Sequence, residues 1–131
     1  MFFCEICNEK ADIHHIVHRH QGGLDIEINY KYLCENHHRG KDGPHRNIKI
    51  DIMYKLELQH KLNKMLPKQY YCFKDLMHIL NISLNIMKRI TKNMTLYKEG
   101  YYKNDIILYL MGGTTYSKDT LDGVLIENLI Y

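Results

Sequence analysis

The first 45 residues of this chain hold a dense concentration of histidine and cysteine. Of nine histidines and four cysteines in the whole sequence, seven and three lie there. A small hydrophobic core is filled at lower free-energy cost by Leu, Ile and Val, because a buried imidazole needs hydrogen-bond partners. Imidazole nitrogens and thiolates are instead common ligands of zinc and similar ions. The pattern therefore predicts that bound metal organises this part of the fold.

Four of these residues form two knuckles with the same spacing. Cys4 and Cys7 have the Cys-x2-Cys spacing that turns two thiolates onto one ion, and Cys34 and His37 repeat the x2 spacing. We expect the four side chains to close a tetrahedral Cys3His zinc site with a structural role. The alternatives are a disulfide, or unpaired cysteines buried as small apolar side chains. No stretch of the sequence resembles a secretion signal, which favours reduced cysteines.

The order of motifs in this segment resembles the signature of HNH nucleases. It comprises Cys-x2-Cys, then His14-His15-Ile16, the turn Gly22-Gly23, Asn29, and a cysteine followed by His37-His38. The second knuckle of the family usually ends in cysteine, whereas here it ends in His37. The resemblance implies a ββα-metal fold, in which a two-stranded ribbon and a helix hold one divalent ion beneath a scissile phosphate of DNA.

The resemblance also implies a role for each matched residue. His14 and His38 would be ligands of the catalytic ion. His15 would be the general base that takes a proton from the attacking water, a role that suits a side chain titrating near neutral pH. Asn29 would hydrogen-bond to backbone across the loop and fix the strand that carries His15. His45 would complete a three-histidine metal site.

The chemistry of the ligands and of the neighbouring residues leaves several choices open. Histidine ligands suit Mn²⁺, Ni²⁺, Zn²⁺ or Co²⁺ better than Mg²⁺, which prefers oxygen. Arg39 and Lys41 either add positive charge near the phosphate or are exposed loop charges. His18 and His20 match nothing in the motif, and we expect them on the loop after the strand, as surface or phosphate contacts. The alternative for the whole set is a solvated histidine cluster, or a second zinc without chemistry.

Charge divides the chain differently from the metal ligands. Residues 1–47 hold six Lys/Arg against seven Asp/Glu, residues 48–103 hold eleven against four, and residues 104–131 hold one against four. The middle segment therefore has a balance of +7, although the whole chain is only +3. A basic segment of this kind favours sustained contact with a nucleic acid backbone.

The middle segment has helical periodicity interrupted by turn signals. Apolar spacing predicts a helix over 50–66 that Pro67 ends, a short helix over 73–80, a helix from Ser83 to Thr91, a hairpin over 96–102 and a last helix from Lys103. This order resembles the winged helix-turn-helix domains of excisionases and MerR-like regulators. The resemblance implies that DNA is contacted by Asn85, Lys88, Arg89, Lys92, Lys98, Tyr101 and Lys103. The alternative is a helical packing module with solvated lysines.

These features together predict an α+β protein. We expect an HNH nuclease domain at 1–49, a connecting helix at 50–66, a winged helix-turn-helix domain at 67–113 and a tail at 114–131, whose aliphatic residues pack on the domain or form a homodimer contact. The expected activity is metal-dependent endonuclease cleavage of DNA, as a nick or a double-strand cut. The alternative is a non-cleaving DNA-binding regulator, or an inhibitor of a host protein.

Composition bears on where the protein acts. The sequence has no run of 18 apolar residues, so we expect no membrane span. A small chain rich in Lys, Ile and Asn is associated with phages and mobile elements of low-GC bacteria. We therefore expect a protein of the bacterial cytoplasm whose partners are DNA and, in the alternative, a host or phage protein.

Overall fold

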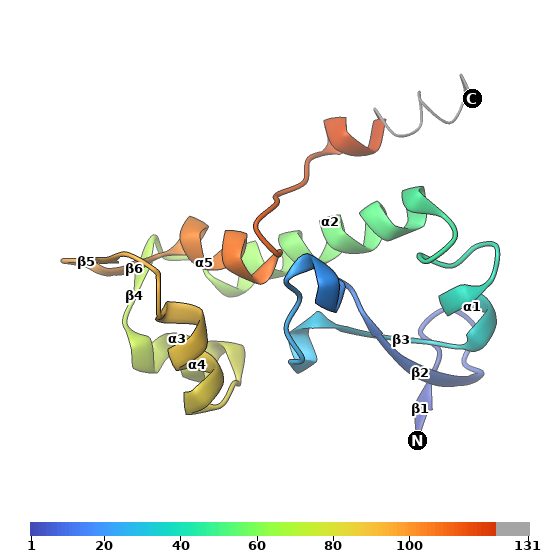
Figure 1. Ribbon diagram of the computed structural model, residues 1–131, viewed down its shortest axis with the longest axis horizontal. Helices are drawn as coiled ribbons and strands as arrows, with labels where there is room; N and C mark the ends of the chain where they lie inside the picture. Colours follow the sequence, from blue (N-terminus) through green and yellow to red (C-terminus); the bar gives the residue numbers. More distant parts are fainter. Residues whose placement is uncertain (123–131) are drawn as a thin grey trace.

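The computed structural model describes residues 1–122 and has a mixed α+β architecture with two small sheets (Figure 1). The N-terminal part is an antiparallel sheet of order β1-β2-β3, followed by one short helix. Between β2 and β3 the chain makes two short 3-10 turns, η1 and η2. The bounds are β1 Phe2–Phe3, β2 Lys10–His15, η1 Arg19–Gln21, η2 Glu27–Asn29, β3 Tyr30–Leu33 and α1 Glu35–Arg39.

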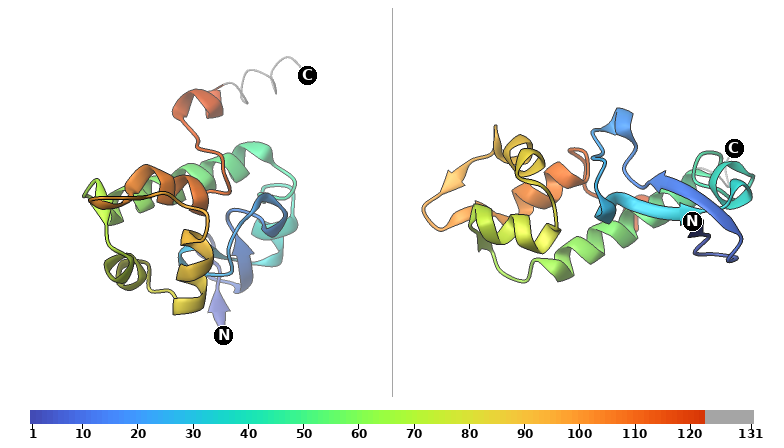
Figure 2. Two further views of the ribbon diagram at one scale, coloured as in Figure 1. Left: turned by 60° about the vertical axis from the view of Figure 1, so that its left-hand side comes forward. Right: turned by 90° about the horizontal axis from the view of Figure 1, so that it is seen from below.

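A long helix, α2 (Ile48–Met65), joins the two halves of the molecule and runs beside both (Figures 1 and 2). Its N-terminus is capped by Asn47, whose side-chain oxygen accepts hydrogen bonds from the backbone N–H groups of Lys49 and Ile50. Leu66 is the C-cap. The helix does not extend further because Pro67 has no backbone N–H to donate. The helix expected over 50–66 is therefore confirmed.

The C-terminal part consists of helix, turn, helix, hairpin and helix. Asn81 adopts a left-handed conformation (φ 52°) that ends the first helix of this part, and the Ser83 hydroxyl accepts a hydrogen bond from Ile86 N to cap the second. Its antiparallel sheet has the order β4-β6-β5. The bounds are β4 Tyr70–Tyr71, α3 Phe73–Leu80, α4 Leu84–Thr91, β5 Leu96–Tyr97, β6 Gly100–Tyr102 and α5 Lys103–Leu110.

The predicted helices and hairpin are confirmed, but strand β4 was not expected. Tyr70 and Tyr71 alone are too short a run of β-favouring residues to predict a strand from sequence. The strand forms because β6 supplies a pairing edge, with Tyr70 opposite Tyr102 and Tyr71 opposite Tyr101. Gly100 allows the close approach: its φ is +124°, and a Cβ there would lie 2.5 Å from the carbonyl oxygen of Tyr71.

One large hydrophobic core spans both parts of the chain. Ile16, Val17, Leu24 and Ile26 from the N-terminal part are buried in the same cluster as side chains from α2, α3, α4 and α5. A second, small cluster contains Cys4, Ala11, Leu33 and Cys34. The N-terminal part therefore packs on the rest of the protein through the loop after β2. The sheet itself encloses only the small second cluster, in which two of the four residues are cysteines.

Two expectations concern the tail and the membrane. Of the aliphatic residues of the tail, Leu121 is described and half-buried, whereas Val124, Leu125, Leu129 and Ile130 lie outside the described residues. Within residues 1–122, no helix has the length and apolar character needed to cross a membrane.

Candidate metal centres and the histidine pocket

The four predicted zinc ligands come together at the N-terminal end of α1. Their ligand atoms all lie within 4.8 Å of one another. Cys4 Sγ is 3.6 Å and Cys34 Sγ 3.2 Å from His37 Nδ1, and Cys7 Sγ is 3.7 Å from Cys34 Sγ. Sulfur ligands about 2.3 Å from a tetrahedral zinc lie about 3.8 Å apart. The cluster therefore has the size and donor set of a structural metal site, and the thiols are not joined as disulfides.

Local backbone geometry explains why these four side chains meet. The first knuckle is closed by a hydrogen bond from Asn8 N to Cys4 O, with Asn8 in a left-handed conformation (φ 65°). Cys34 is the N-cap of α1, and its sulfur accepts a hydrogen bond from His37 N. Burial raises the pKa of Cys4, but backbone N–H groups directed at its sulfur outweigh this and lower the pKa to about 6. The first knuckle thus favours the thiolate form of Cys4, whereas the neighbouring thiols Cys34 and Cys4 raise the pKa of Cys7.

A second group is formed by His14, His38 and His45, which come from β2, α1 and the loop after α1. Their ligand nitrogens also lie within 4.8 Å of one another, and Nε2 of His38 is 2.9 Å from Nε2 of His45. Nitrogens about 2.1 Å from one ion lie about 3.0–3.4 Å apart. Gly43 allows the loop to return, because a Cβ there would lie 2.4 Å from the carbonyl oxygen of His38.

The most telling atom of this group is Nε2 of His14. The His14 side chain is buried. Among the buried side-chain nitrogen and oxygen atoms of residues 1–122, this nitrogen is the only one without a hydrogen-bond partner. A buried polar atom without a partner costs free energy, so such atoms are rare in native proteins. Coordination of an ion shared with His38 and His45 would satisfy it. The residues present therefore fit a metal ion.

Burial keeps these imidazoles neutral, which is the form that binds metal. Burial and the neighbouring histidines lower the pKa of His14 to about 3, and burial together with His45 and Arg39 lowers the pKa of His38 to about 4. Burial and Arg39 also lower the pKa of His45. At neutral pH these nitrogens are therefore available as lone-pair donors without competition from protons.

His15 lies beside this group and pairs with a carboxylate. Its Nε2 is 2.9 Å from Asp25 Oδ1, and the same oxygen accepts a 2.6 Å hydrogen bond from the Tyr30 hydroxyl. The hydrogen bonds from Tyr30 and His15 lower the pKa of Asp25, which therefore stays a carboxylate. His15 Nδ1 is left to act as an acceptor. Asp25 was not anticipated from the sequence, because it lies ten residues beyond His15 and beyond the glycine turn.

Asn29 is placed as expected for a residue that fixes the loop. Its side chain is buried and makes three hydrogen bonds to backbone: Oδ1 accepts from Val17 N at 2.8 Å, and Nδ2 donates to Val17 O at 3.0 Å and Leu24 O at 2.9 Å. The amide thereby clamps the two sides of the loop just after the strand that carries His14 and His15.

His18 lies on the loop after β2, as expected, and lines the hollow, but it is more buried than a surface residue. Its side chain is only 15% exposed, and Nε2 lies 3.2 Å from Asp51 Oδ1 of α2. The other oxygen of Asp51 accepts a 2.8 Å hydrogen bond from the buried Lys55. His14, His18 and Asp51 form a third group of potential ligands. Sequence reasoning missed Asp51, because only packing of α2 against the loop brings it to a residue 33 positions away.

A hollow of about 400 Å³ gives access to the histidines. Arg39, one of the two predicted phosphate contacts, lines it, while Lys41 lies on the exposed loop after α1. The full lining is Ile13, His14, His15, His18, Arg19, His20, His38, Arg39 and His45. Predicted ligands, predicted base and two arginines therefore face one solvent-accessible space.

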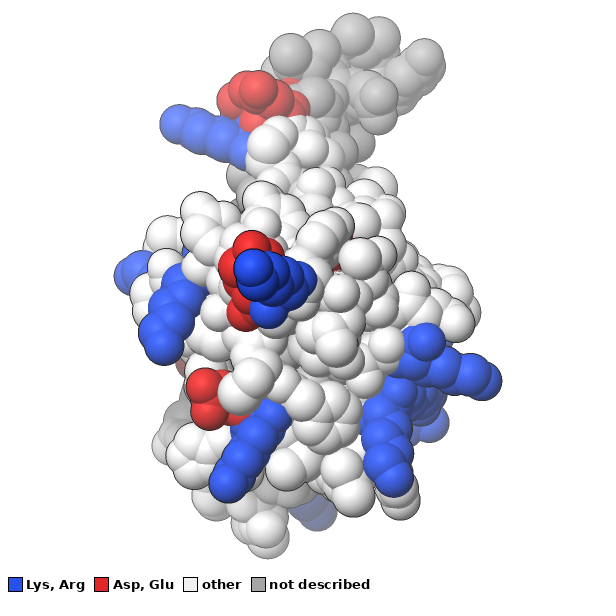
Figure 3. All heavy atoms as spheres, turned by 90° about the vertical axis from the view of Figure 1, so that its left-hand side faces the viewer, with Lys and Arg blue, Asp and Glu red and all other residues white. Residues whose placement is uncertain are grey.

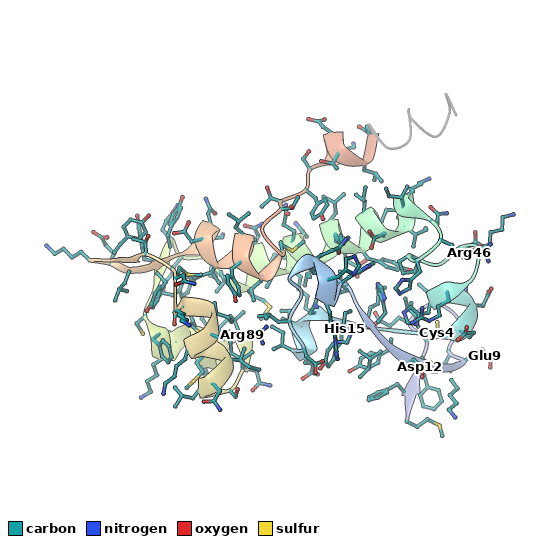
Figure 4. The ribbon with its side chains drawn as sticks, in the orientation of Figure 1. Cys4, Glu9, Asp12, His15, Arg46 and Arg89 are labelled. Carbon is teal, nitrogen blue, oxygen red and sulfur yellow. The ribbon has the colours of Figure 1, made fainter. Side chains whose placement is uncertain are left out.

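The predicted DNA-contacting residues lie in the C-terminal part of the protein, whose hairpin β5–β6 forms one end of the molecule. In Figure 4 His15 lies between Cys4, in the first knuckle, and Arg89 on α4. Asn85, Lys88, Arg89, Lys92 and Lys98 are exposed, whereas Tyr101 packs partly on the core and Lys103 donates to the carbonyl of Asn63. Figure 3 looks onto this end, where Lys and Arg side chains project and acidic side chains are fewer.

Comparisons of the chain with models of protein families, with curated proteins and with solved structures found no significant match. The function is therefore inferred from the geometry of the two clusters and from the surface of the basic segment.

Proposed function

We propose that this protein is a metal-dependent DNA endonuclease of the HNH type, with a zinc-stabilised N-terminal domain and a winged helix-turn-helix segment that binds DNA. The observation that carries the proposal is the unpartnered Nε2 of the buried His14, which faces the imidazoles of His38 and His45. The His15–Asp25 pair lines the same hollow. A ligand set and a general base in one accessible space are what phosphodiester hydrolysis requires.

The residues of the chain divide the chemistry between them. A divalent ion held by His14, His38 and His45 would polarise the phosphate and stabilise the charge that grows on the leaving oxygen. His15 accepts the proton of the attacking water at Nδ1. Asp25 holds the other nitrogen of His15 in its protonated tautomer and stabilises the imidazolium that results.

Other residues position these groups or add charge. Asn29 holds the loop after β2 through its three backbone hydrogen bonds, so that His15 keeps its direction. Arg39 places positive charge on the wall of the hollow, where it can contact a phosphate oxygen. With three imidazole ligands, Mn²⁺, Ni²⁺, Zn²⁺ and Co²⁺ suit the catalytic site better than Mg²⁺.

The zinc knuckles have a structural role in this proposal. Cys4, Cys7, Cys34 and His37 tie the N-terminus to the start of α1, the helix that carries His38. The small cluster beneath them buries few side chains, so metal ligation supplies stability that packing cannot.

DNA binding is assigned to the basic C-terminal part. Helix α4 buries Met87 and Ile90 and presents Asn85, Lys88 and Arg89 to solvent, which suits insertion of its exposed face into the major groove. The hairpin β5–β6, with Lys98 in its turn, would lie along the flanking backbone.

A plasmid-cleavage assay across the divalent ions tests the proposal. Supercoiled DNA should become nicked or linear only with a divalent ion, and His15→Ala should reduce turnover about 100- to 10,000-fold. His60→Ala is the matched control, because His60 is exposed on α2 and far from the motif; its activity should equal that of the parent.

Two results would contradict the proposal. Equal cleavage by His15→Ala and the parent would remove His15 from the role of base. Absence of cleavage with every ion, despite a folded and zinc-loaded protein, would favour the non-cleaving regulator or host-protein inhibitor instead.

A further inference from the structure

A second, larger hollow lies between the loop after β2 and helices α4 and α5. Its volume is about 680 Å³, which is within the range of pockets that hold small molecules. We call it the arginine cleft. The lining residues that bear on its chemistry are Arg19, Arg89, Asn93, Tyr97, Asp105 and Tyr109.

Two glycines form the base of this cleft by letting two segments touch. Gly22 (φ +90°) and Gly112 (φ +78°) are in left-handed conformations, and a Cβ on Gly112 would lie 2.2 Å from the carbonyl oxygen of Gln21. The loop that carries Arg19 is therefore held against the C-terminal end of α5, as Figures 1 and 2 both show. The cleft is a built feature of the tertiary structure rather than a gap between mobile parts.

The cleft is a neighbour of the histidine hollow. Arg19 lines both spaces, and its guanidinium lies 3.7 Å from Asp25 Oδ2, the carboxylate that pairs with His15. A strand bound at the histidines therefore has a path past Arg19 toward Arg89 and Tyr97.

The lining matches the chemistry of a single nucleotide. Arg19 and Arg89 supply positive charge for phosphate, and no ion pair of Arg89 occurs within residues 1–122. Tyr97, whose residue surface is 43% exposed, has its ring held by edge contacts with Tyr70 and Tyr102, and it contributes an aromatic side chain on which a base can stack. Asn93 and Asp105 add a donor and acceptors that can meet the polar edge of a base.

We propose that the arginine cleft binds an unpaired nucleotide of the substrate strand, next to the phosphate at the histidines. A paired base would first have to leave the stack, which costs free energy that an unpaired base does not pay. The preferred substrate is then DNA with an unpaired segment beside the cut, such as a flap or bulge. This inference rests on the proposed DNA cleavage for the place of the cut, and on the cleft itself for nucleotide binding.

The test measures binding in the His15→Ala background, so that DNA stays intact. Fluorescence anisotropy compares a labelled duplex with the same duplex that carries an unpaired thymidine flap. The flap should improve affinity by about tenfold, the amount expected for one stacked base. Tyr97→Leu should abolish this gain and leave duplex affinity unchanged, while Tyr97→Phe, which retains the ring, should keep it.

Phe3→Leu is the matched control, because it also removes an exposed aromatic ring, but Phe3 lies on β1 and does not line the cleft. Thermal melting establishes that each variant is folded. Equal affinity for flap and duplex, or an equal loss in Phe3→Leu and Tyr97→Leu, would overturn the inference. If the flap preference and its loss in Tyr97→Leu hold while the parent cuts no DNA with any ion, the proposed cleavage fails and the nucleotide site stands.

Discussion

Removal of the Asn29 amide should destabilise the protein strongly. In Asn29→Ala, the N–H and C=O of Val17 and the C=O of Leu24 lose their partner. Val17 is 1% and Leu24 4% exposed, so solvent replaces these bonds poorly. Each unsatisfied buried group costs about 1–3 kcal/mol, and water entering the vacated space recovers part of it. We expect a loss of about 3 kcal/mol in the free energy of unfolding.

This loss converts into a measurable change in melting temperature. Unfolding entropy is about 2.1 cal/mol/K per residue, which for this chain gives about 0.28 kcal/mol/K. A loss of about 3 kcal/mol then lowers Tm by about 11 °C. Differential scanning calorimetry of zinc-loaded protein measures it. Asn29→Asp should be comparably destabilised, because its carboxylate still accepts from Val17 N but faces two carbonyl oxygens.

Asn63→Ala is the matched control for this change. Asn63 is exposed on α2 and its side chain makes one hydrogen bond, to the carbonyl of Gln59. Its Tm should stay within about 2 °C of the parent, because exposed substitutions are usually worth less than about 0.5 kcal/mol. If Asn29→Ala also melts within that interval, the amide does not clamp the loop and Asn29 has no positioning role.

Three further results are expected. Cys34→Ser should lose one zinc ion per chain, measured by elemental analysis, and melt at a much lower temperature, whereas Cys72→Ser, at an exposed cysteine outside the cluster, should keep the zinc content and Tm of the parent; equal zinc content in the two variants would contradict the knuckle site. Because the pKa of His14 is about 3 and that of His38 about 4, below the ordinary 6.5, the unfolded chain binds more protons. Protein that keeps zinc in the knuckles but holds no ion at His14, His38 and His45 should therefore lose stability as pH falls from about 6.5 toward 4. Urea unfolding should show a shallower pH dependence in His14→Gln, and an identical slope would refute the burial argument. Lys88→Ala with Lys92→Ala should reduce the slope of log affinity for DNA against log salt by about 0.9 for each phosphate that is no longer neutralised; an unchanged slope in anisotropy titrations would make these lysines part of a solvated face.

Much of the secondary structure was predictable because its signals are local. Asn47 and Ser83 cap the helices that follow them, and Pro67 prevents the continuation of α2. Strand β4 escaped prediction because two residues form a strand only where a partner edge exists, and that edge is β6, about thirty positions later. Short strands are therefore decided by packing, whereas capped helices are decided by neighbours in the chain.

The metal clusters divide in the same way. The spacing of Cys4 and Cys7, and of Cys34 and His37, already brings each pair together, since two residues separated by two others fit one turn around an ion. The sequence therefore predicted that these four side chains cluster, and the structure brings them together. The roles of His14, His15 and His38 were predicted from the resemblance in motif order. That His14 has an unpartnered nitrogen is a property of its burial, which only the folded structure reveals.

Tertiary structure alone decided the contacts between distant segments. Asp51 meets His18 because α2 packs across the loop after β2, and Arg19 shares a cleft with Arg89 because Gly22 and Gly112 allow two backbones to touch. No periodicity or spacing encodes such pairs, since they depend on how a buried core orients whole elements. Helix caps and ligand pairs depend on residues close together in the sequence, but the shape of the space around the histidines depends on packing between distant segments.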